Sequence, residues 1–298
     1  MKLLHIGGGH QCNVSFIRRA CALYNIEYHH TANTNFPDNS YDIIWAPADW
    51  IDPDRYPQSK ILFGPHFFVF PDPSHPLFTR IKPEHASRCV YLCLSDWNVQ
   101  VHKQFVSQSI LPFVAIPFGL DIPYKPKATE TEYDCILYYK ARHPIHLDQC
   151  VQEVQKRGLR YKVYRYGSYE RNEFLDTLSK TKFVIWIGSH ESQGFGLEEC
   201  LATGTPIYNY DVISMKDEYV NNNYTYSHIP YPLHATSAPY WDERCGLKVY
   251  SIDELKGRFD EFIAALPTYR PADYVSEILT DRVCFQRFLD VLNIRMNL

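Results

Sequence analysis

The fold of this chain is decided by one stretch of sequence, Phe183-Val-Ile-Trp-Ile-Gly-Ser-His-Glu-Ser-Gln-Gly-Phe-Gly-Leu-Glu-Glu-Cys-Leu-Ala-Thr-Gly-Thr-Pro-Ile207. Its apolar start is typical of a parallel strand buried on both faces. A helix is expected to begin near Phe195 and to end at Gly204, because Pro206 prevents continuation. Strand, helix and strand in succession form the repeating unit of an α/β sheet.

Two acidic residues, Glu191 and Glu199, flank the N-terminus expected for this helix. Gly194 and Gly196 allow backbone N–H groups to approach a ligand there, which favours an anion. Carboxylates repel phosphate, so the pattern fits a ligand whose hydroxyl groups face the acids while the amides face the anion. A nucleotide sugar offers both groups. The alternative is an ordinary acidic first turn stabilised by the helix dipole.

The segment from Glu191 to Pro206 resembles the Glu-x7-Glu signature of retaining GT-B glycosyltransferases, especially glycosyltransferase family 4. The resemblance implies an α/β fold with two Rossmann-like, doubly wound domains facing a central cleft, and a C-terminal helix that crosses back to the first domain. It also implies that Glu199 holds the ribose and Glu191 the sugar hydroxyls. Gly194 and the amides of Phe195 and Gly196 would then hold the diphosphate.

Length and composition bound the function classes. The 298 residues are enough for two compact α/β units. A net charge of −4 provides no general attraction to nucleic acid, so we expect no nucleic-acid partner. No run approaches the about 18 apolar residues that a membrane span needs, and the N-terminus reaches glycine too soon for a signal peptide. We therefore expect no transmembrane segment and a cytoplasmic location. Nine cysteines without a CxxC pair indicate mostly buried free thiols.

The domain boundary is predicted from a second resemblance. The segment from Val114 to Asp121 resembles the strand and Pro-x-Gly-x-Asp turn that closes the first domain in family 4 enzymes, and linker composition follows it. We expect an N-terminal, acceptor-side domain over residues 1–122 and a C-terminal, donor-side domain over residues 123–275. A terminal helix over residues 276–298 is expected to pack back on the N-terminal domain.

Glycines also follow the first predicted strand, Leu3 to Ile6. The dinucleotide fingerprint would need a further glycine where Cys12 stands, so Gly8 and Gly9 support only a close backbone approach to the donor. The GT-B resemblance implies that this loop faces the cleft.

His66 is a polar residue in an apolar loop. As a first-domain histidine does in related enzymes, it would contact a donor-sugar hydroxyl across the cleft. The alternative is a core histidine satisfied by the backbone, and His10 is a weaker candidate for the same contact.

Fixed cations stabilise the charge that a departing diphosphate develops, and Lys140 and Arg142 are the candidates. Family 4 members usually carry an arginine here and a lysine a few residues later. Arg142 matches the arginine, but Leu147 and Asp148 stand downstream, so Lys140 would substitute for the lysine. A solvated Lys-x-Arg turn is the alternative.

Two aromatic groups complete the candidates. Tyr166, Gly167 and Tyr169 occupy the region where the family holds the nucleotide base, although a packing role is equally consistent with them. Tyr240, Trp241 and Asp242 are candidate donor or acceptor contacts, because a tryptophan in an irregular segment either packs or binds something.

The function predicted from these features is retaining transfer of a sugar from a nucleoside-diphosphate sugar, UDP- or GDP-linked, to a glycan or another hydroxyl acceptor. We expect no essential metal ion or cofactor. Three alternatives remain open: a non-catalytic nucleotide- or sugar-binding module, a GT-B nucleotide-sugar epimerase or phosphorylase, and an inverting enzyme with His10 or Asp49 as its base.

Overall fold

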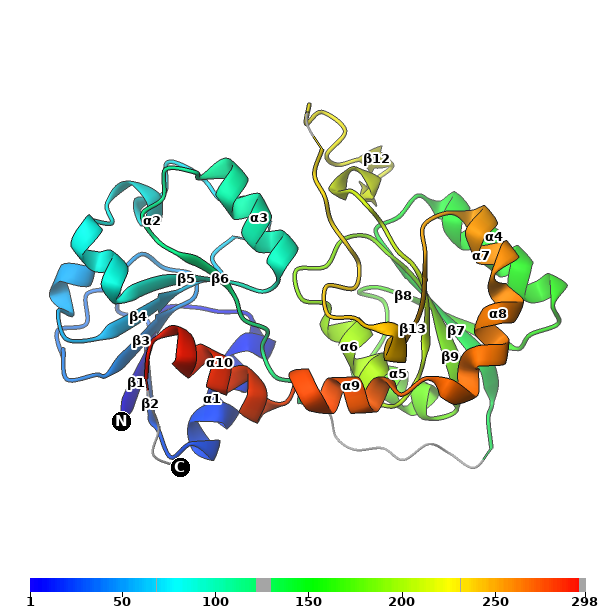
Figure 1. The fold of residues 1–298 in the computed structure, drawn as a ribbon, viewed down its shortest axis with the longest axis horizontal. Helices are drawn as coiled ribbons and strands as arrows, with labels where there is room; N and C mark the ends of the chain where they lie inside the picture. Colours follow the sequence, from blue (N-terminus) through cyan, green and yellow to red (C-terminus); the bar gives the residue numbers. More distant parts are fainter. Residues whose placement is uncertain (68, 122–129, 231, 295–298) are drawn as a thin grey trace. The chain divides into compact units, whose positions relative to one another are not determined.

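The chain forms two compact units, each with its own sheet and core (Figure 1). Our computed structural model describes residues 1–67, 69–121, 130–230 and 232–294. Unit 1 comprises Met1–Asp121 and Leu279–Leu298, and unit 2 comprises Ile122–Ile278. The boundary predicted between residues 122 and 123 lies outside the described residues.

Unit 1 is built on a parallel sheet with strand order β2-β1-β3-β4-β5-β6. Its strands are β1 (Lys2–Ile6), β2 (Glu27–Thr31), β3 (Ile43–Ala46), β4 (Lys60–Phe63), β5 (Cys89–Cys93) and β6 (Phe113–Ala115). Strands β3 and β5 are buried along their whole length, which explains their nearly continuous apolar sequence.

Helices α1 (Gln11–Leu23), α2 (Pro76–Thr79), α3 (Asp96–Phe105) and α10 (Asp281–Val291) belong to the same unit. The C-terminal helix α10 packs on α1, as predicted. Arg19 on α1 donates to both carboxylate oxygens of Asp281, at 2.8 and 2.9 Å, and the rings of Tyr24 and Phe285 lie 5.2 Å apart. Helix α10 is therefore part of the structure of unit 1.

Unit 2 contains a second parallel sheet, with strand order β13-β10-β9-β7-β8. Its strands are β7 (Tyr133–Lys140), β8 (Tyr161–Arg165), β9 (Thr181–Gly188), β10 (Ile207–Tyr210) and β13 (Gly246–Val249). Its helices are α4 (Pro144–Lys156), α5 (Arg171–Ser179), α6 (Phe195–Ala202), α7 (Ile252–Gly257), α8 (Phe259–Ala265) and α9 (Pro271–Ile278).

In each sheet the first strand lies between the second and the third, so the strand order reverses there. Parallel α/β sheets bind ligands beyond the carboxyl ends of their strands at such a reversal. In unit 2 the reversal lies between β7 and β9, and in unit 1 between β1 and β3. These two edges are where functional residues are expected.

The segment between β10 and β13 is largely irregular. It contains the short hairpin of β11 (Tyr219–Val220) and β12 (Asn223–Tyr224). A second segment, Leu233–Ala238, returns beside the end of β10, and we call it the strap. Its backbone pairs with residues 213–215 through an antiparallel bridge between Ser214 and His234.

Candidate functional site

The strand reversal of unit 2 brings together Lys140, the last residue of β7, and Glu191, three residues beyond β9. The Lys140 Nζ atom lies 2.7 Å from Glu191 Oε1, and both side chains are about 15% exposed (15% and 14%). The Glu191 N–H donates to the carbonyl of Thr236 in the strap at 3.0 Å. Main chain and side chain together hold Glu191 in place.

Burial and the lysine act on Glu191 in opposite directions. Burial raises the pKa of its carboxyl group, while the neighbouring Lys140 ammonium lowers it. The ammonium also lies 4.3 Å from the centre of the Tyr166 ring, within cation–π range. Lys140 is therefore held between an acid and an exposed aromatic ring.

The start of α6 depends on two glycines. Gly194 is the N-cap and has φ +95°, a left-handed conformation that other residues rarely adopt. A Cβ atom on Gly196 would meet Trp186 at 3.4 Å and Tyr138 at 3.6 Å, so this glycine allows close packing. The first turn of an α-helix, here the turn that begins at Phe195, directs its amides beyond the N-terminus and favours negative charge there.

Glu199 lies on the same helix and is 13% exposed. Its carboxylate lies 2.5 Å from the Arg171 Nε atom at the start of α5. Burial raises the pKa of Glu199, and Arg171 lowers it. The two acids predicted for ligand hydroxyls are thus each partly buried and each paired with one cation.

Glu198, for which no role was predicted, is fully buried. The Gln193 side-chain amide donates to its Oε2 atom at 3.0 Å, and its Oε1 atom has no hydrogen-bond partner within the described part of the chain. Burial first, and then the charges of Glu191 and Glu199, raise the pKa of Glu198 well above the usual range. Glu198 therefore lies beneath the site with its protonated form favoured, and sequence alone could not separate it from Glu199.

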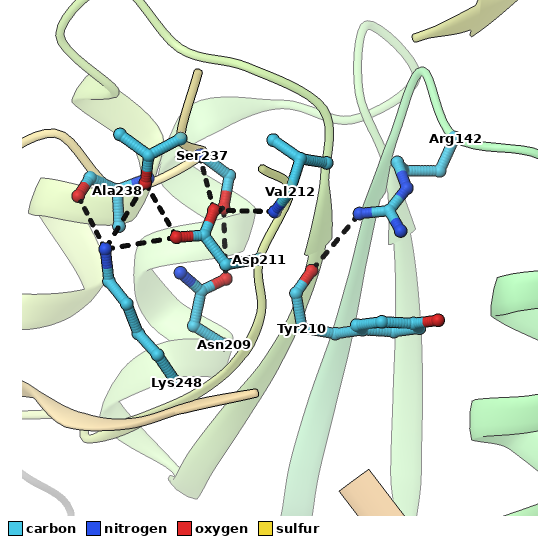
Figure 2. Close-up of polar contacts among 9 residues, drawn as sticks. Arg142, Asn209, Tyr210, Asp211, Val212, Ser237, Ala238 and Lys248 are labelled. Carbon is cyan, nitrogen blue, oxygen red and sulfur yellow. Dashed lines mark hydrogen bonds and ion pairs between the residues drawn. The ribbon is translucent and has the colours of Figure 1, made fainter. Parts of the chain in front are cut away.

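Arg142 points into the sheet instead of towards solvent (Figure 2). Its side chain is buried and donates to the carbonyl oxygens of Gly188 at 3.1 Å and Tyr210 at 3.3 Å. The guanidinium also lies 4.9 Å from the Tyr210 ring. Burial lowers the pKa of Arg142. In this arrangement Arg142 joins the ends of β9 and β10, and its diphosphate role stays a prediction.

The candidate base-binding residues follow β8. Tyr166 is 61% exposed, and Gly167 has φ +76°. Tyr169 instead packs inward: its hydroxyl lies 3.2 Å from that of Tyr138, and burial raises its pKa to about 12. Tyr138 in turn stacks on Trp186 with ring centres 3.9 Å apart. Tyr166 is available to a ligand, whereas Tyr169 supports the floor below α6.

In unit 1, the glycine loop after β1 faces a carboxylate that comes from the segment after β3. Asp49 Oδ2 accepts from the Gly8 amide at 3.2 Å. A Cβ atom on Gly7 would lie 1.9 Å from that oxygen, so only glycine fits there. Gly8, Gly9 and His10 are exposed, and His10 is the N-cap of α1.

His66 is half-buried near this loop. Its Nε2 atom lies 3.1 Å from the Asp49 carbonyl oxygen, which accepts a hydrogen bond, and its amide donates to the Tyr91 hydroxyl at 3.1 Å. Burial lowers the pKa of His66 to about 4, so the ring is neutral at physiological pH. A neutral ring held by a backbone carbonyl fits the core alternative, and the sugar contact stays a prediction.

The last cluster lies between the strap and β13. Asp242 caps a 3-10 helix by accepting from the Arg244 amide at 2.9 Å and pairs with the Arg244 guanidinium at 2.7 Å. These contacts give Asp242 a structural role. Tyr240 and Trp241 are partly exposed, and Trp241 lines a cavity described below.

The described residues lack both a metal-binding cluster and a membrane-spanning helix. They contain no group of three or more His, Cys, Asp or Glu side chains arranged to hold a metal ion. The residues Asp52 and Asp54 form an Asp-x-Asp pair, but both side chains have structural partners. Asp54 contacts Lys82 and His85, and Asp52 caps a short helix. Within the same residues, every helix is too short or too polar to span a bilayer.

Comparisons with known proteins place the fold. No protein-family model matches the chain, and no curated protein matches its sequence. Among solved structures, AviGT4, a glycosyltransferase involved in avilamycin A biosynthesis, is similar with a TM-score of 0.59 at 12% identity, over 98% of this chain and 97% of that chain. The fold is GT-B. Sucrose-phosphate synthase from Thermosynechococcus elongatus, with a TM-score of 0.55 at 12% identity and 98% coverage of both chains, is a second similar structure.

These likenesses concern the fold, since the identities are low. The α/β class, the two Rossmann-like GT-B units and the contact of the C-terminal helix with α1 are confirmed. The roles of individual residues are not addressed by a GT-B likeness, because one fold hosts many functions.

Proposed function

We propose that this protein is a glycosyltransferase that moves a sugar from a nucleoside-diphosphate sugar, UDP- or GDP-linked, to a hydroxyl of a glycan or similar acceptor. The anomeric configuration is retained, and no metal ion is essential. Unit 2 binds the donor and unit 1 the acceptor.

One observation carries the proposal: at the strand reversal of unit 2, Glu191, in the loop that leads into α6, lies 2.7 Å from Lys140 at the end of β7. Glu191 offers an acceptor for hydroxyl groups of the donor sugar, and Glu199 does the same for the ribose. The first-turn amides of α6 and the Lys140 ammonium meet the diphosphate. Tyr166, 61% exposed, lies where the base can stack.

The proposed chemistry needs little from side chains. The bond between the anomeric carbon and the diphosphate oxygen breaks, and the bonding electrons leave with the diphosphate. Lys140 and the α6 amides stabilise that charge. The acceptor hydroxyl attacks the same face of the sugar and gives its proton to a donor phosphate oxygen. In unit 1, Gly8 and Gly9 are proposed to approach the donor through their backbone, and His66, with His10 as the weaker candidate, to contact the transferred sugar.

The donor is identified by thermal unfolding in the presence of UDP, GDP, ADP and their sugars, since a ligand that binds the native state raises its stability. We expect one nucleotide series to raise the midpoint. The Glu191→Gln substitution should weaken binding of the nucleotide sugar more than binding of the free nucleotide, because Glu191 contacts only the sugar. A screen in which no nucleotide raises the midpoint contradicts the proposal.

A non-catalytic nucleotide-sugar-binding module is the second candidate. It is favoured by the burial of Arg142, which commits the guanidinium to two carbonyl oxygens and leaves Lys140 as the remaining predicted cation for the leaving group. Hydrolysis of the bound donor separates the two candidates. Slow nucleotide release by the wild type that Glu191→Gln abolishes supports the enzyme, whereas binding without any release supports the module.

A further inference from the structure

A cavity of about 430 Å³ lies beyond the carboxyl ends of β10 and β13 in unit 2. The strap forms one wall, and Trp241, Lys248 and Tyr250 line the remainder with the residues after β10. Its volume falls within the about 300–1,000 Å³ of small-molecule sites. Every lining residue belongs to the described part of unit 2, so the cavity is defined within one unit.

A buried carboxylate anchors the strap wall (Figure 2). Asp211, 2% exposed, accepts hydrogen bonds from the amides of Val212 and Ser237 at 2.8 and 2.6 Å. The hydroxyls of Thr236 and Ser237 each donate to it at 2.7 Å. With Lys248 at 3.1 Å, five donors surround an anion that has about four lone-pair sites. The carboxylate is therefore fully committed to the protein.

Lys248 is committed in the same way. Its Nζ atom reaches Asp211 at 3.1 Å, the Thr236 hydroxyl at 3.3 Å and the Ala238 carbonyl at 3.1 Å. An ammonium group has three protons, so each one has an acceptor. Asp211 and Lys248 are the acidic residue and the lysine of the lining, and they neutralise each other. A phosphate or carboxylate ligand would have to break this network, so the cavity favours a neutral ligand.

The remaining lining is amphipathic. Tyr250 is 51% exposed and Ile213 is 66% exposed, while the Trp241 ring is partly exposed with the Lys248 ammonium 5.4 Å from its centre. Large apolar side chains that stay exposed beside a concave surface indicate a binding site. An indole or phenol ring combines an apolar face with a polar edge, which matches a sugar ring with its C–H face and its hydroxyls.

The strap also connects the cavity to the donor loop. Thr236 donates its hydroxyl to Asp211 on the cavity side, and its carbonyl accepts the Glu191 amide on the other. A Cβ atom on Gly194 would lie 3.7 Å from the Ser237 carbonyl oxygen, so the strap lies directly against the turn before α6. A ligand in the cavity is separated from the Glu191 loop by one extended segment.

We propose that this cavity binds a neutral saccharide unit, with Trp241 and Tyr250 against the sugar ring. Its assignment as one part of the acceptor rests on the proposed function, in which unit 1 binds the remainder of the acceptor; neutral-sugar binding itself does not rest on that function. In the proposed function, the strap separates this unit from the donor sugar that Glu191 contacts.

The test is saturation-transfer NMR on the full chain with a panel of neutral methyl glycosides and disaccharides. Glucose 6-phosphate and glucuronate serve as charged probes. We expect the wild-type protein to transfer saturation to at least one neutral sugar. Trp241→Ala should weaken its binding about tenfold or more, which corresponds to about 1.4 kcal/mol. Trp97→Ala, at a partly exposed tryptophan on α3 of unit 1, is the matched control and should leave the signal unchanged.

The outcomes separate this inference from the proposed function. No signal from any neutral sugar, a signal unchanged in Trp241→Ala, or preference for the charged probes overturns the cavity assignment. If nucleotide raises the unfolding midpoint of Trp241→Ala, unit 2 of the variant is folded. Tyr250→Ala is a second substitution in the cavity lining and removes a smaller ring. Neutral-sugar binding without any nucleotide binding overturns the proposed function and its acceptor assignment but supports the site.

Discussion

At the scale of residues, three acids near the start of α6 have different surroundings. Glu191 and Glu199 are partly buried and each faces a cation, so they can accept hydrogen bonds as ionised groups. Glu198 is fully buried with only an amide as donor, and burial raises its pKa well above the usual range. Burial thus favours the protonated form most strongly at the one acid of the three that has no cation beside it among the described residues.

The raised pKa of Glu198 gives stability a definite pH dependence. The folded state keeps this proton after the unfolded chain has lost it, so the free energy of unfolding falls as pH rises from the ordinary glutamate value of 4.5 towards the raised pKa. Glu198→Gln stays neutral and keeps an oxygen for the Gln193 amide. We expect denaturant titrations of the variant to show a flatter decline between pH 4.5 and neutrality. Glu243→Gln, at an exposed acid, should follow the wild type, and parallel curves for all three proteins would contradict the argument.

Lys140 controls the charge of Glu191. Lys140→Met leaves this carboxyl buried without its cation, so its pKa rises further and its ionised form appears only at higher pH. We expect nucleotide-sugar affinity to fall about tenfold or more near neutral pH, since hydrogen bonds to charged groups contribute about 1.5–3 kcal/mol. The part of the loss that arises from Glu191 should shrink as pH rises, whereas the part that arises from the missing ammonium–diphosphate contact should persist. Calorimetric titration at several pH values measures both parts.

Lys182→Met is the matched control for that experiment. Lys182 is 48% exposed and pairs with Asp134 at the start of β7, at the opposite end of the strand from Lys140. Equal effects of the two lysine variants would show that the loss arises from net charge and not from the Glu191 contact.

At the scale of elements, the sequence predicted the buried strands well and the polar ones poorly. β9 was predicted from its apolar run, whereas the edge strand β2, with sequence Glu-Tyr-His-His-Thr, was missed because only one side of it pairs and none of its residues is fully buried. The range predicted as one terminal helix, residues 276–298, contains the end of α9 and the whole of α10, which are separated where Thr280 caps α10. The pairing of an edge strand and the cap of a helix depend on contacts with other residues. The periodicity of apolar residues along the sequence does not reveal such contacts.

Gly194 tests whether the turn before α6 is built for binding. Gly194→Ala forces a side chain into the left-handed region at a cost of about 1–2 kcal/mol, and the added Cβ meets that of Glu191 at 3.4 Å. We expect a lower unfolding midpoint, by about 2–4 °C per kcal/mol, together with weaker nucleotide-sugar binding.

The control is Gly158→Ala, which places the same strain after α4, at φ +65° with no atom within 4 Å of the added Cβ. It should lower the midpoint similarly and leave binding unchanged. If both variants lost affinity equally, general destabilisation would be the cause, and the special role of Gly194 would be rejected.

At the scale of the whole molecule, two separate cores imply two unfolding transitions, and a ligand of unit 2 should raise only one of them. Asp281→Ala removes the acceptor of two Arg19 hydrogen bonds between α1 and α10. We expect the nucleotide-insensitive transition to fall by about 2–4 °C per kcal/mol lost. Differential scanning calorimetry with and without nucleotide resolves the two.

Asp121→Ala supplies the comparison within unit 1. Asp121 lies 3.5 Å from the same arginine but is 66% exposed, and exposed ion pairs contribute about 0–1 kcal/mol. We expect little change. A fall of the nucleotide-sensitive transition in Asp281→Ala would contradict the assignment of α10 to unit 1.

The candidate site was predictable only in part. The Glu-x7-Glu pattern located the loop, because glycines and acids at fixed spacing have a local cause. The partners of these acids were not foreseen. Lys140 was predicted only as a diphosphate contact, and its pairing with Glu191, like the contacts of Arg171 and the Thr236 carbonyl, depends on how distant strands and the strap meet. For Arg142, the position in the sequence fits a ligand-binding role, but the observed side-chain hydrogen bonds go to carbonyl oxygens of the protein itself.

The path of the backbone has a consequence for biosynthesis. Because the chain leaves unit 1 at Asp121 and re-enters it at Leu279, the sequence of unit 2 is inserted into the sequence of unit 1. Domains fold as units while the ribosome elongates the polypeptide. Residues 130–278 can therefore complete their sheet on the nascent chain, whereas the α1 face awaits α10, which is translated after unit 2.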